Sequence, residues 1–411
     1  MLLSKCFMDN QTTREHFFAP GLGEKDEAIN TRKIINDLLR PLSVKERDIV
    51  KRRFGLDRPD RETLEKVGRL HGLTRERIRQ IENSIINQKL KRLKEKKREL
   101  PALRDLITAL LGDHGGLMEK EYLFLVLDSL SHSPEGKKEK ETKVKRNHFD
   151  FLFSKIFSEE LEEVKKSLRF KDGYRLRSHD LDHIEELAEE LLQEIKEAKR
   201  ILKIDELLEL ISKLPSYSKH QEKFRRENCL ELDSTLEKIF LCPQEFNVAV
   251  NHRSLYSVLQ AIKDIEPNKF GYWGSSNSNE ISPRTINDKI YLILKNEGRP
   301  MHFSDLAHRI NEIGFDHKKA NPATIHNELI LDEKYVLIGR GMYGLKEWGL
   351  KKGTVAEVIK DILSSSGKPL SREEIIDEVL KTREVKRSTI NLALSKRSEF
   401  KKTEDNKYTL A

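Results

Sequence analysis

Residues 73–82 read LTRERIRQIE, and residues 63–72 immediately before them read TLEKVGRLHG. Thr63 and Thr74 each stand at the start of a helix-forming run, where threonine is a favoured N-terminal cap. Gly72 lies between the two runs, at the position where a tight turn needs a positive φ. The spacing predicts two short helices joined by a turn, which is a helix-turn-helix.

The second of these helices continues towards Leu93 and has two different faces. At about 100° per residue, its isoleucines gather on one side: Ile78, Ile81 and Ile85. The opposite side carries Arg75, Glu76, Arg79 and Gln80. A helix that reads the major groove needs this division, because apolar residues anchor it while donors and acceptors face the base edges. An ordinary amphipathic helix with a solvated charged face is the alternative explanation.

Individual side chains on the polar face match particular base edges. Arg75 offers a forked pair of donors to guanine, Glu76 can accept from the amino group of cytosine, and Gln80 can pair with adenine or touch thymine. Arg77 and Arg79 are placed for phosphate oxygens. The N-terminal half of this helix is therefore the predicted base-reading element.

A further helix precedes the pair. Leu42, Ile49, Val50 and Phe54 recur at helical intervals, a serine stands ready to cap the N-terminus, and Gly55 can close the C-terminus. Residues 41–98 hold 19 of the Lys and Arg side chains but only 9 Asp and Glu, whereas the whole chain has a net charge of +8. The basic excess therefore lies in one segment, as expected where a module meets a polyanion.

Residues 42–94 resemble the C-terminal, promoter-binding domain (region 4) of primary sigma factors. The matching pieces are VKRRFGL at 50–56, TLEKVG at 63–68 and LTRERIRQIE at 73–82. The resemblance implies that Arg75, Glu76 and Gln80 read the upstream (minus-thirty-five) promoter element. It also implies that the DNA backbone is contacted by Thr63, Leu64, Arg77 and Arg79. Double-stranded DNA and the β flap of RNA polymerase are the implied partners.

The resemblance covers only about an eighth of the chain. A working sigma factor carries further domains before region 4, and about forty residues precede Leu42 here. A DNA-melting segment rich in Trp and Tyr is also missing, with 2 Trp in the chain. We therefore expect a protein that is not a complete sigma factor and does not melt DNA itself.

The last ~130 residues contain an internal repeat. Residues 294–306 align with 363–375, the pair Thr324-Ile325 aligns with Thr389-Ile390, and residues 343–345 align with 408–410. Each copy reads helix, Gly-x-Pro turn, helix, third helix, then a β-hairpin ending in Tyr-x-Leu. That order predicts a winged helix.

The first copy, residues 282–349, resembles the HARE-HTH domain. The resemblance is carried by GRPM at 298–301, Asp305-Leu306, NPATI at 321–325 and GMYGL at 341–345 followed by Trp348. The family includes the folded domain of the polymerase δ subunit and modules of chromatin and restriction proteins. It implies association with nucleic acid or polymerase, and fixes no base-reading residue.

Two weaker winged-helix-like units are expected between these regions. One covers residues 103–177 and contains a charged segment, residues 134–146, that we interpret as a mobile loop. A long amphipathic helix at 181–200 leads to the other, residues 204–273, and residues 275–279 read as a linker. Helical spacer material is the alternative for both.

The expected fold is mainly α with small β-hairpin wings: a helix-turn-helix domain followed by several winged-helix-like units. The expected boundaries are 1–40 for an N-terminal extension or helix, 41–99 for the sigma-like domain, 100–180 for the first weaker unit, 181–281 for the long helix, second weaker unit and linker, 282–350 for the HARE-HTH unit, and 351–411 for the last unit.

No enzymatic chemistry is predicted. The sequence has no GxxxxGK[ST], HExxH or GxSxG motif. Cys6, Cys229 and Cys242 lack CxxC spacing, and we interpret His302, His308, His317 and His326 as surface or core histidines rather than metal ligands. We therefore expect no catalytic residues, no metal and no cofactor.

The sequence thus predicts a DNA-binding bacterial transcription factor. It has no apolar run long enough for a membrane span and no signal peptide, so we expect a cytoplasmic protein. One alternative is a protein-binding, delta-like accessory factor of RNA polymerase. The other is the recognition component of a defence or restriction system.

Overall fold

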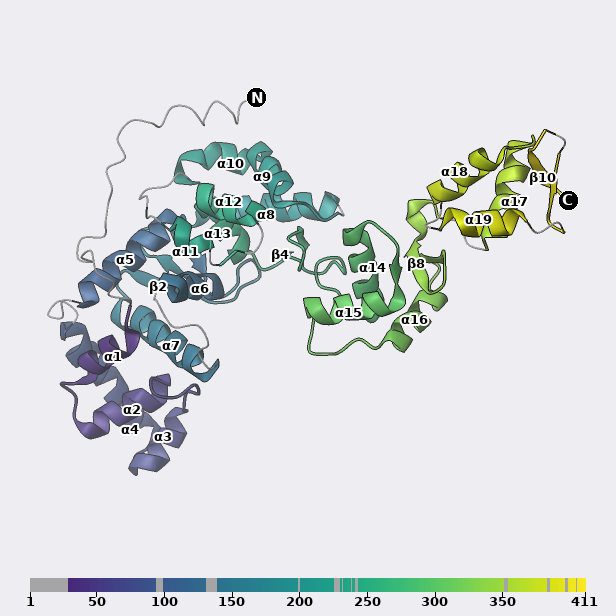
Figure 1. The fold of residues 1–411 in the computed structure, drawn as a ribbon. Coiled ribbons are helices and arrows are strands. Elements are labelled where there is room, and N and C mark those ends of the chain that lie inside the picture. Colours follow the sequence, from purple (N-terminus) through teal and green to yellow (C-terminus); the bar gives the residue numbers. More distant parts are fainter. Residues whose placement is uncertain are drawn as a thin grey trace. The chain divides into compact units, whose positions relative to one another are not determined.

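The computed structural model describes residues 29–93, 99–130, 139–198, 200–224, 230, 232–237, 239–240, 243–350, 354–382, 385–395, 398–403 and 405–411. The first 28 residues of the predicted N-terminal extension and the three cysteines lie outside them. The chain forms two compact units, Met1–Glu266 with Trp273–Ser276, and Pro267–Tyr272 with Asn277–Ala411. Both are mostly helical with small antiparallel sheets, as the sequence predicts (Figure 1).

The first unit begins with the helix-turn-helix. Its helices are α1 (Thr31–Leu39), α2 (Val44–Phe54), α3 (Leu64–His71) and α4 (Arg75–Ser84), and α4 continues as the π-helix η1 (Ile85–Leu90) and the 3-10 helix η2 (Lys91–Leu93). Ser43, Thr63 and Thr74 cap α2, α3 and α4 with their side-chain oxygens, as predicted. Gly55 and Gly72 end α2 and α3 with φ of 67° and 64°.

A small apolar core holds the helix-turn-helix together. Ile49 of α2, Val67 of α3 and Ile78 of α4 are fully buried against one another. Ile85 continues the inward face of α4 into the main core of the unit. The predicted division of this helix into an apolar and a polar side is therefore confirmed.

The next part of the first unit combines three helices with a three-stranded sheet. Its elements are α5 (Glu99–Asp113), β1 (Leu117–Glu119), α6 (Lys120–Leu130), α7 (Glu139–Phe151), the π-helix η3 (Leu152–Ile156), β2 (Leu161–Val164) and β3 (Gly173–Leu176). The sheet has the order β1-β3-β2 and is antiparallel, with Met118 opposite Tyr174 and Leu161 opposite Leu176.

The predicted loop at residues 134–146 is wrong over the part that the structure describes. Helix α7 begins at Glu139, and residues 134–138 lie outside the described residues. The charges of α7 are paired with α6: Lys145 lies 2.6 Å from Asp128, and Arg146 lies 2.6 Å from Glu121. These long-range ion pairs give the charged run partners that its local composition does not reveal.

The rest of the first unit is helical and ends in a hairpin. Its helices are α8 (Asp182–Ala198), α9 (Ile204–Lys213), α10 (Pro215–His220), η4 (Gln221–Phe224), α11 (Asp233–Glu237), α12 (Pro243–Asn251) and α13 (Arg253–Ala261), and strands β4 (Ile265–Pro267) and β5 (Trp273–Ser275) pair. Helix α8 matches the predicted amphipathic helix, with Leu187 and Leu191 fully buried. A single core runs from Ile34 to Trp273.

A buried ion pair lies within this core. Arg253 of α13 donates to Asp113 of α5 at 2.7 Å, and both side chains are fully buried. The backbone of Leu230 completes the arrangement, accepting from Arg253 and donating to Asp113. Removing one partner would leave an uncompensated buried charge and would therefore destabilise the first unit.

The second unit contains the sequence repeat. Its first copy comprises α14 (Ile286–Glu297), β6 (Met301–His302), α15 (Phe303–Ile313), α16 (Pro322–Leu331), β7 (Tyr335–Leu337), β8 (Met342–Leu345) and the 3-10 helix η5 (Lys346–Trp348). Its second copy comprises α17 (Val355–Ser366), α18 (Arg372–Thr382), α19 (Arg387–Leu394), β9 (Phe400–Lys402) and β10 (Tyr408–Leu410).

The two copies share their order of elements. Strands β6, β7 and β8 form an antiparallel sheet with the order β6-β8-β7, while β9 pairs with β10, and Leu370 bridges to Tyr408. Gly298 and Gly367 end the first helix of each copy in the left-handed conformation, with φ of 65° and 59°. Each copy has its own hydrophobic core.

Candidate nucleic-acid interface

The candidate interface is built on the N-terminal ends of α3 and α4. Thr63 and Thr74 accept hydrogen bonds from the backbone N–H groups of Lys66 and Arg77, each at 3.2 Å. Gly68 lies against the turn between the two helices and is buried. The caps and the turn therefore fix the orientation of α4 relative to α3.

The four predicted polar-face residues of α4 are exposed: Arg75, Glu76, Arg79 and Gln80. Arg79 donates to both carboxylate oxygens of Glu76, at 2.8 and 2.7 Å. Gln80 donates to Glu76 at 3.5 Å and accepts from Arg77 at 3.2 Å. Arg75 forms no hydrogen bond or ion pair with any residue that the structure describes. The face thus combines a linked network with one guanidinium left open to solvent.

The network sets the charge of Glu76. The hydrogen bond from Arg79 lowers the pKa of the Glu76 carboxyl, and the same contact raises the pKa of Arg79. Glu76 is therefore an ionised acceptor, held by neighbours that also face outward. A carboxylate in this state can accept from a cytosine amino group, and its movement would free Arg79 for a phosphate.

The residues assigned to the DNA backbone occupy three different settings. Thr63 is exposed and caps α3, whereas Leu64 is half-buried and packs against the core of the helix-turn-helix. Arg77 and Arg79 are exposed on α4. Since the side chain of Leu64 points into the core, any contact that Leu64 makes with a phosphate comes from its backbone N–H at the helix N-terminus.

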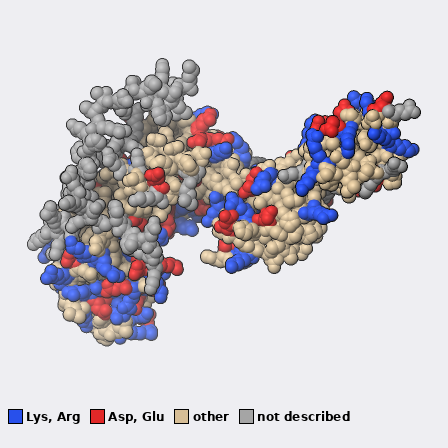
Figure 2. Space-filling view, viewed as in Figure 1, with Lys and Arg blue, Asp and Glu red and all other residues tan. Residues whose placement is uncertain are grey.

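Basic side chains surround this interface. Figure 2 shows Lys and Arg spread over the lobe formed by α2, α3 and α4, with Asp and Glu between them. Buried Glu62 is a centre of this arrangement and contacts Arg52, Arg58 and Lys66 at 3.5, 3.1 and 3.3 Å. Burial acts to raise the pKa of Glu62, and its cationic partners bring that pKa below the usual value.

The sequence did not predict the contact between the module and α7. Asn147 donates through Nδ2 to the carbonyl oxygens of Gly55 (3.2 Å) and Pro59 (3.1 Å). Phe151 packs on Phe54 with ring centroids 4.8 Å apart, and Asp150 pairs with Arg61. Helix α7 therefore holds the loop between α2 and α3 from a position about ninety residues further along the chain.

His148 of α7 makes a second set of hydrogen bonds to the helix-turn-helix module. Its Nε2 lies 2.7 Å from the carbonyl oxygen of Leu56, and its Nδ1 lies 3.0 Å from the hydroxyl of Thr31. Burial lowers the pKa of His148, which favours the neutral ring. The neutral tautomer that fits donates through Nε2 and accepts through Nδ1, so one imidazole joins α1 to the end of α2.

The histidines of the first repeat copy contact aromatic rings in tilted or edge-on geometry or face solvent. His302 lies 4.4 Å and His326 4.8 Å from the ring of Phe303, and His326 also approaches Tyr343. His308 and His317 are exposed. Among the described residues, no group of three or more His, Cys, Asp or Glu is placed to hold a metal ion.

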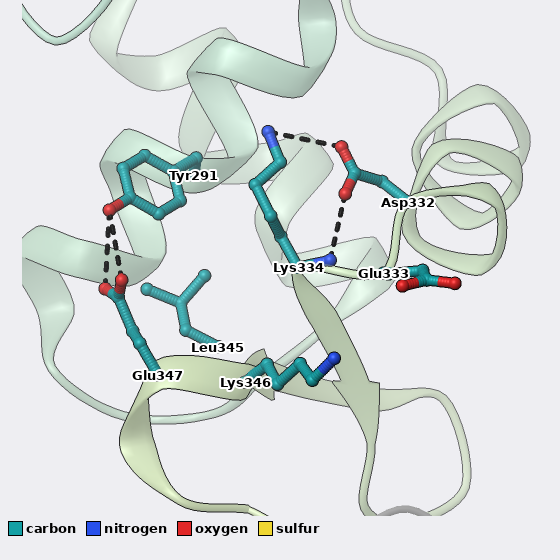
Figure 3. Close-up of a pocket in the computed structure, with 7 residues that line it drawn as sticks. All are labelled: Tyr291, Asp332, Glu333, Lys334, Leu345, Lys346 and Glu347. Carbon is teal, nitrogen blue, oxygen red and sulfur yellow. Dashed lines mark hydrogen bonds and ion pairs between the residues drawn. The ribbon is translucent and has the colours of Figure 1, made fainter.

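A hollow on the second unit is lined by charged side chains and Tyr291 (Figure 3). Lys334 pairs with Asp332 at 3.2 Å, and the Tyr291 hydroxyl donates to Glu347 at 3.3 Å. The lining contains no serine, cysteine or histidine.

Comparison with known proteins bears on the segment that carries the interface. Residues 38–95 match the family described as Sigma-70, region 4. The matching relatives include RNA polymerase sigma factor SigA of Listeria monocytogenes, with 52% identity over 48 residues, which is 12% of this chain and 13% of the relative. RNA polymerase sigma factor SigA1 of Synechococcus elongatus is 44% identical over 66 residues, 16% of each chain.

The likeness to sigma factors covers a small part of each chain. The chloroplastic sigma factor sigF of Arabidopsis thaliana is 44% identical over 52 residues, 13% of this chain and 10% of the relative. The chain thus spans about a sixth or less of the length of these three relatives. No solved structure matches the chain. In the described part of the chain, every helix is too short or too polar to cross a membrane.

Proposed function

We propose that this protein binds promoter-type duplex DNA through α3 and α4 and acts on transcription initiation without melting DNA itself. The observation that carries the proposal is the exposed polar face at the start of α4, in a segment similar to Sigma-70 region 4. In this proposal Arg75, Glu76 and Gln80 read bases. Thr63, Leu64, Arg77 and Arg79 contact the sugar-phosphate backbone.

RNA polymerase is the protein partner in this proposal, through its β flap, and the site of action is the bacterial cytoplasm. The relatives are named as RNA polymerase sigma factors, which supports a polymerase partner. A delta-like accessory factor that binds polymerase and no DNA is the alternative. The second unit supports this alternative, because its helix α16 exposes Ile330 and Leu331 and contains no Lys or Arg.

The remaining parts of the chain are proposed to be winged-helix units, with residues 282–350 forming a HARE-HTH domain. The sheet orders β1-β3-β2 and β6-β8-β7 support this, because in each sheet the last strand pairs with the first. The proposed boundaries 282–350 and 351–411 enclose separate hydrophobic cores and can be tested by expressing each segment alone, whereas the proposed units 100–180 and 181–281 share one core and are tested within the whole first unit. A segment that lacks a cooperative thermal transition contradicts its boundary.

The proposal is tested by titrating the full chain against promoter-type and scrambled duplexes at several salt concentrations. Arg75→Ala should weaken binding to the preferred duplex by about 1–3 kcal/mol and leave scrambled DNA nearly unaffected. Lys45→Ala, which removes one exposed charge from α2, is the matched control and should keep the preference. Equal losses on both duplexes would refute the base-reading role of Arg75.

Glu76→Ala gives a second, opposite readout. It removes an acceptor and frees Arg79, so we expect the preference to disappear while affinity for scrambled DNA stays equal or rises. Absence of DNA binding by the intact protein at moderate salt, together with binding to a purified polymerase flap, would establish the accessory-factor alternative. We also propose that the protein is not an enzyme; cleavage of duplex DNA in Mg²⁺ by the pure protein, or by a co-purifying nuclease, would point instead to a defence system.

A further inference from the structure

The two repeat copies can be compared residue by residue from the third helix to the end of the hairpin. Thr324-Ile325 aligns with Thr389-Ile390 and Tyr343 with Tyr408, always 65 positions apart. Ile325 and Ile390 are both fully buried. Gly341 and Asn406 occupy the same place in the hairpin and both have a positive φ, 69° and 59°. The alignment is therefore structural as well as sequential.

The charge of the two copies differs sharply over this matched segment. Residues 386–410 contain seven Lys and Arg and three Asp and Glu, whereas residues 321–345 contain two and three. The difference lies partly before the hairpin, where residues 386–399 have four Lys and Arg against one in residues 321–334, and partly within it, where residues 400–410 have three against one in residues 335–345. Three apolar positions of the first copy, Val336, Leu337 and Met342, are all lysines in the second: Lys401, Lys402 and Lys407.

The three lysines are exposed and open to a partner. Lys401 and Lys402 lie on β9, opposite Thr409 and Tyr408 of β10, and Lys407 follows the hairpin turn. None of the three forms an ion pair within the described parts of the chain. Strand residues next to each other point to opposite faces, so Lys401 and Lys402 place charge on both sides of the hairpin.

The third helices of the two copies also differ in the side chains that they expose. Helix α16 exposes Ile330 and Leu331. Helix α19 begins after Lys386 and exposes Ser388 and Thr389, with Leu392 in the next turn. Hydroxyl groups can bond to base edges and phosphates, and an exposed leucine can contact the thymine methyl group. Figure 2 shows Lys and Arg on the part of the second unit that contains α19.

We infer that α19 and strands β9 and β10 form a second site for duplex DNA, in which α19 enters a groove and the three exposed lysines bind phosphates. Arg387 is already paired with Glu373 at 3.0 Å, so the phosphate contacts fall to Lys401, Lys402 and Lys407. B-form DNA is the duplex that fits, because its major groove admits a helix, whereas the deep and narrow groove of duplex RNA does not. This site adds to the one on α4 and does not require it.

The first test is crosslinking of the full chain to a long duplex through a photoreactive phenylalanine analogue placed at Thr389, Thr324 or Gln80. Thr389 and Thr324 are exposed equivalents in the two copies, and Gln80 reports on α4. We expect crosslinks from position 389 and none from 324. If position 80 crosslinks and position 389 does not, this inference is overturned and the proposed function still stands. Reaction at 389 supports the inference whether or not position 80 reacts.

The second test is the salt dependence of duplex binding. Replacing Lys401 and Lys402 by Gln should reduce the slope of log K against log salt by about 2, because each lost phosphate contact contributes about 0.9. The matched variant with Lys318 and Lys319 replaced by Gln removes two exposed lysines from the first copy and should keep the slope. An equal slope for both variants, or stronger binding to duplex RNA than to DNA, overturns the inference.

Discussion

Replacing Gly68 by alanine tests how tightly the two helices of the helix-turn-helix are joined. Alanine in the middle of a helix normally stabilises it by about 1 kcal/mol relative to glycine. At this position, however, the added Cβ would lie 2.6 Å from the carbonyl oxygen of Leu73. Helix propensity therefore predicts that Gly68→Ala stabilises the domain, whereas packing predicts that it destabilises the domain. The measured change in stability decides between the two.

The packing effect should be the larger. Ordinary contacts of a Cβ atom begin at 3.4 Å, so the neighbouring group would have to move by about 0.8 Å. That group is backbone within the turn, and the N–H of Leu73 is already bonded to the carbonyl oxygen of Gly68 at 2.9 Å. Overpacking of this kind costs about 2–3 kcal/mol, which leaves a net loss of about 1–2 kcal/mol after the gain in helix propensity.

The assay is hydrogen exchange of the full chain, measured over residues 63–84, together with affinity for the preferred duplex. Gly68→Ala should lower protection and, because α4 must shift against α3, should weaken specific binding more than binding to scrambled DNA. Gly72→Ala is the control: its φ of 64° makes alanine unfavourable, but its Cβ meets nothing within 4 Å, so the turn keeps its shape. Higher protection in Gly68→Ala with unchanged DNA preference would refute the reasoning.

Three further predictions concern the first unit. Asn147→Ala should lower the free energy of unfolding in urea by about 1–3 kcal/mol, because it leaves the carbonyl oxygens of Gly55 and Pro59 without their donor. An unchanged free energy of unfolding would show that these hydrogen bonds do not stabilise the unit. Burial, with nearby cations, lowers the pKa of His183 to about 4, so below its usual value of 6.5 the unfolded chain takes up a proton that the folded chain resists. The free energy of unfolding should therefore fall as the pH drops from about 6.5 to about 4, and this slope should flatten in His183→Gln. Thr74→Ala should reduce the thermal stability of the helix-turn-helix by about 1 kcal/mol through loss of the cap, whereas Thr74→Ser should restore it.

The local signals in the sequence were sufficient for the helix-turn-helix. Its boundaries depend on caps and turn residues that act within four positions of themselves: Ser43, Thr63, Thr74, Gly55 and Gly72. The same holds for the repeat, where glycine ends the first helix of each copy. Such features are readable because the side chain and the backbone group that it satisfies are close in sequence.

Contacts between distant segments could not be read in this way. The residues 139–146 looked like a solvated loop because their partners in α6 are not adjacent in the sequence. The polar face of α4 was predicted, but not the way in which Arg79 holds Glu76 by two hydrogen bonds. Pattern and spacing give the face of a helix, whereas rotamers and cross-chain pairing depend on the packed neighbours.

The attachment of α7 changes how the interface should work. A DNA-binding domain on a flexible linker loses conformational freedom when it binds. Here α1, α2 and η1 share one hydrophobic core with α7 and η3, and buried His148 joins Thr31 to Leu56. The reading helix is therefore already fixed to the rest of the first unit before it meets DNA. DNA binding therefore costs less conformational entropy. The orientation of α4 on a duplex also determines where the remainder of the first unit lies.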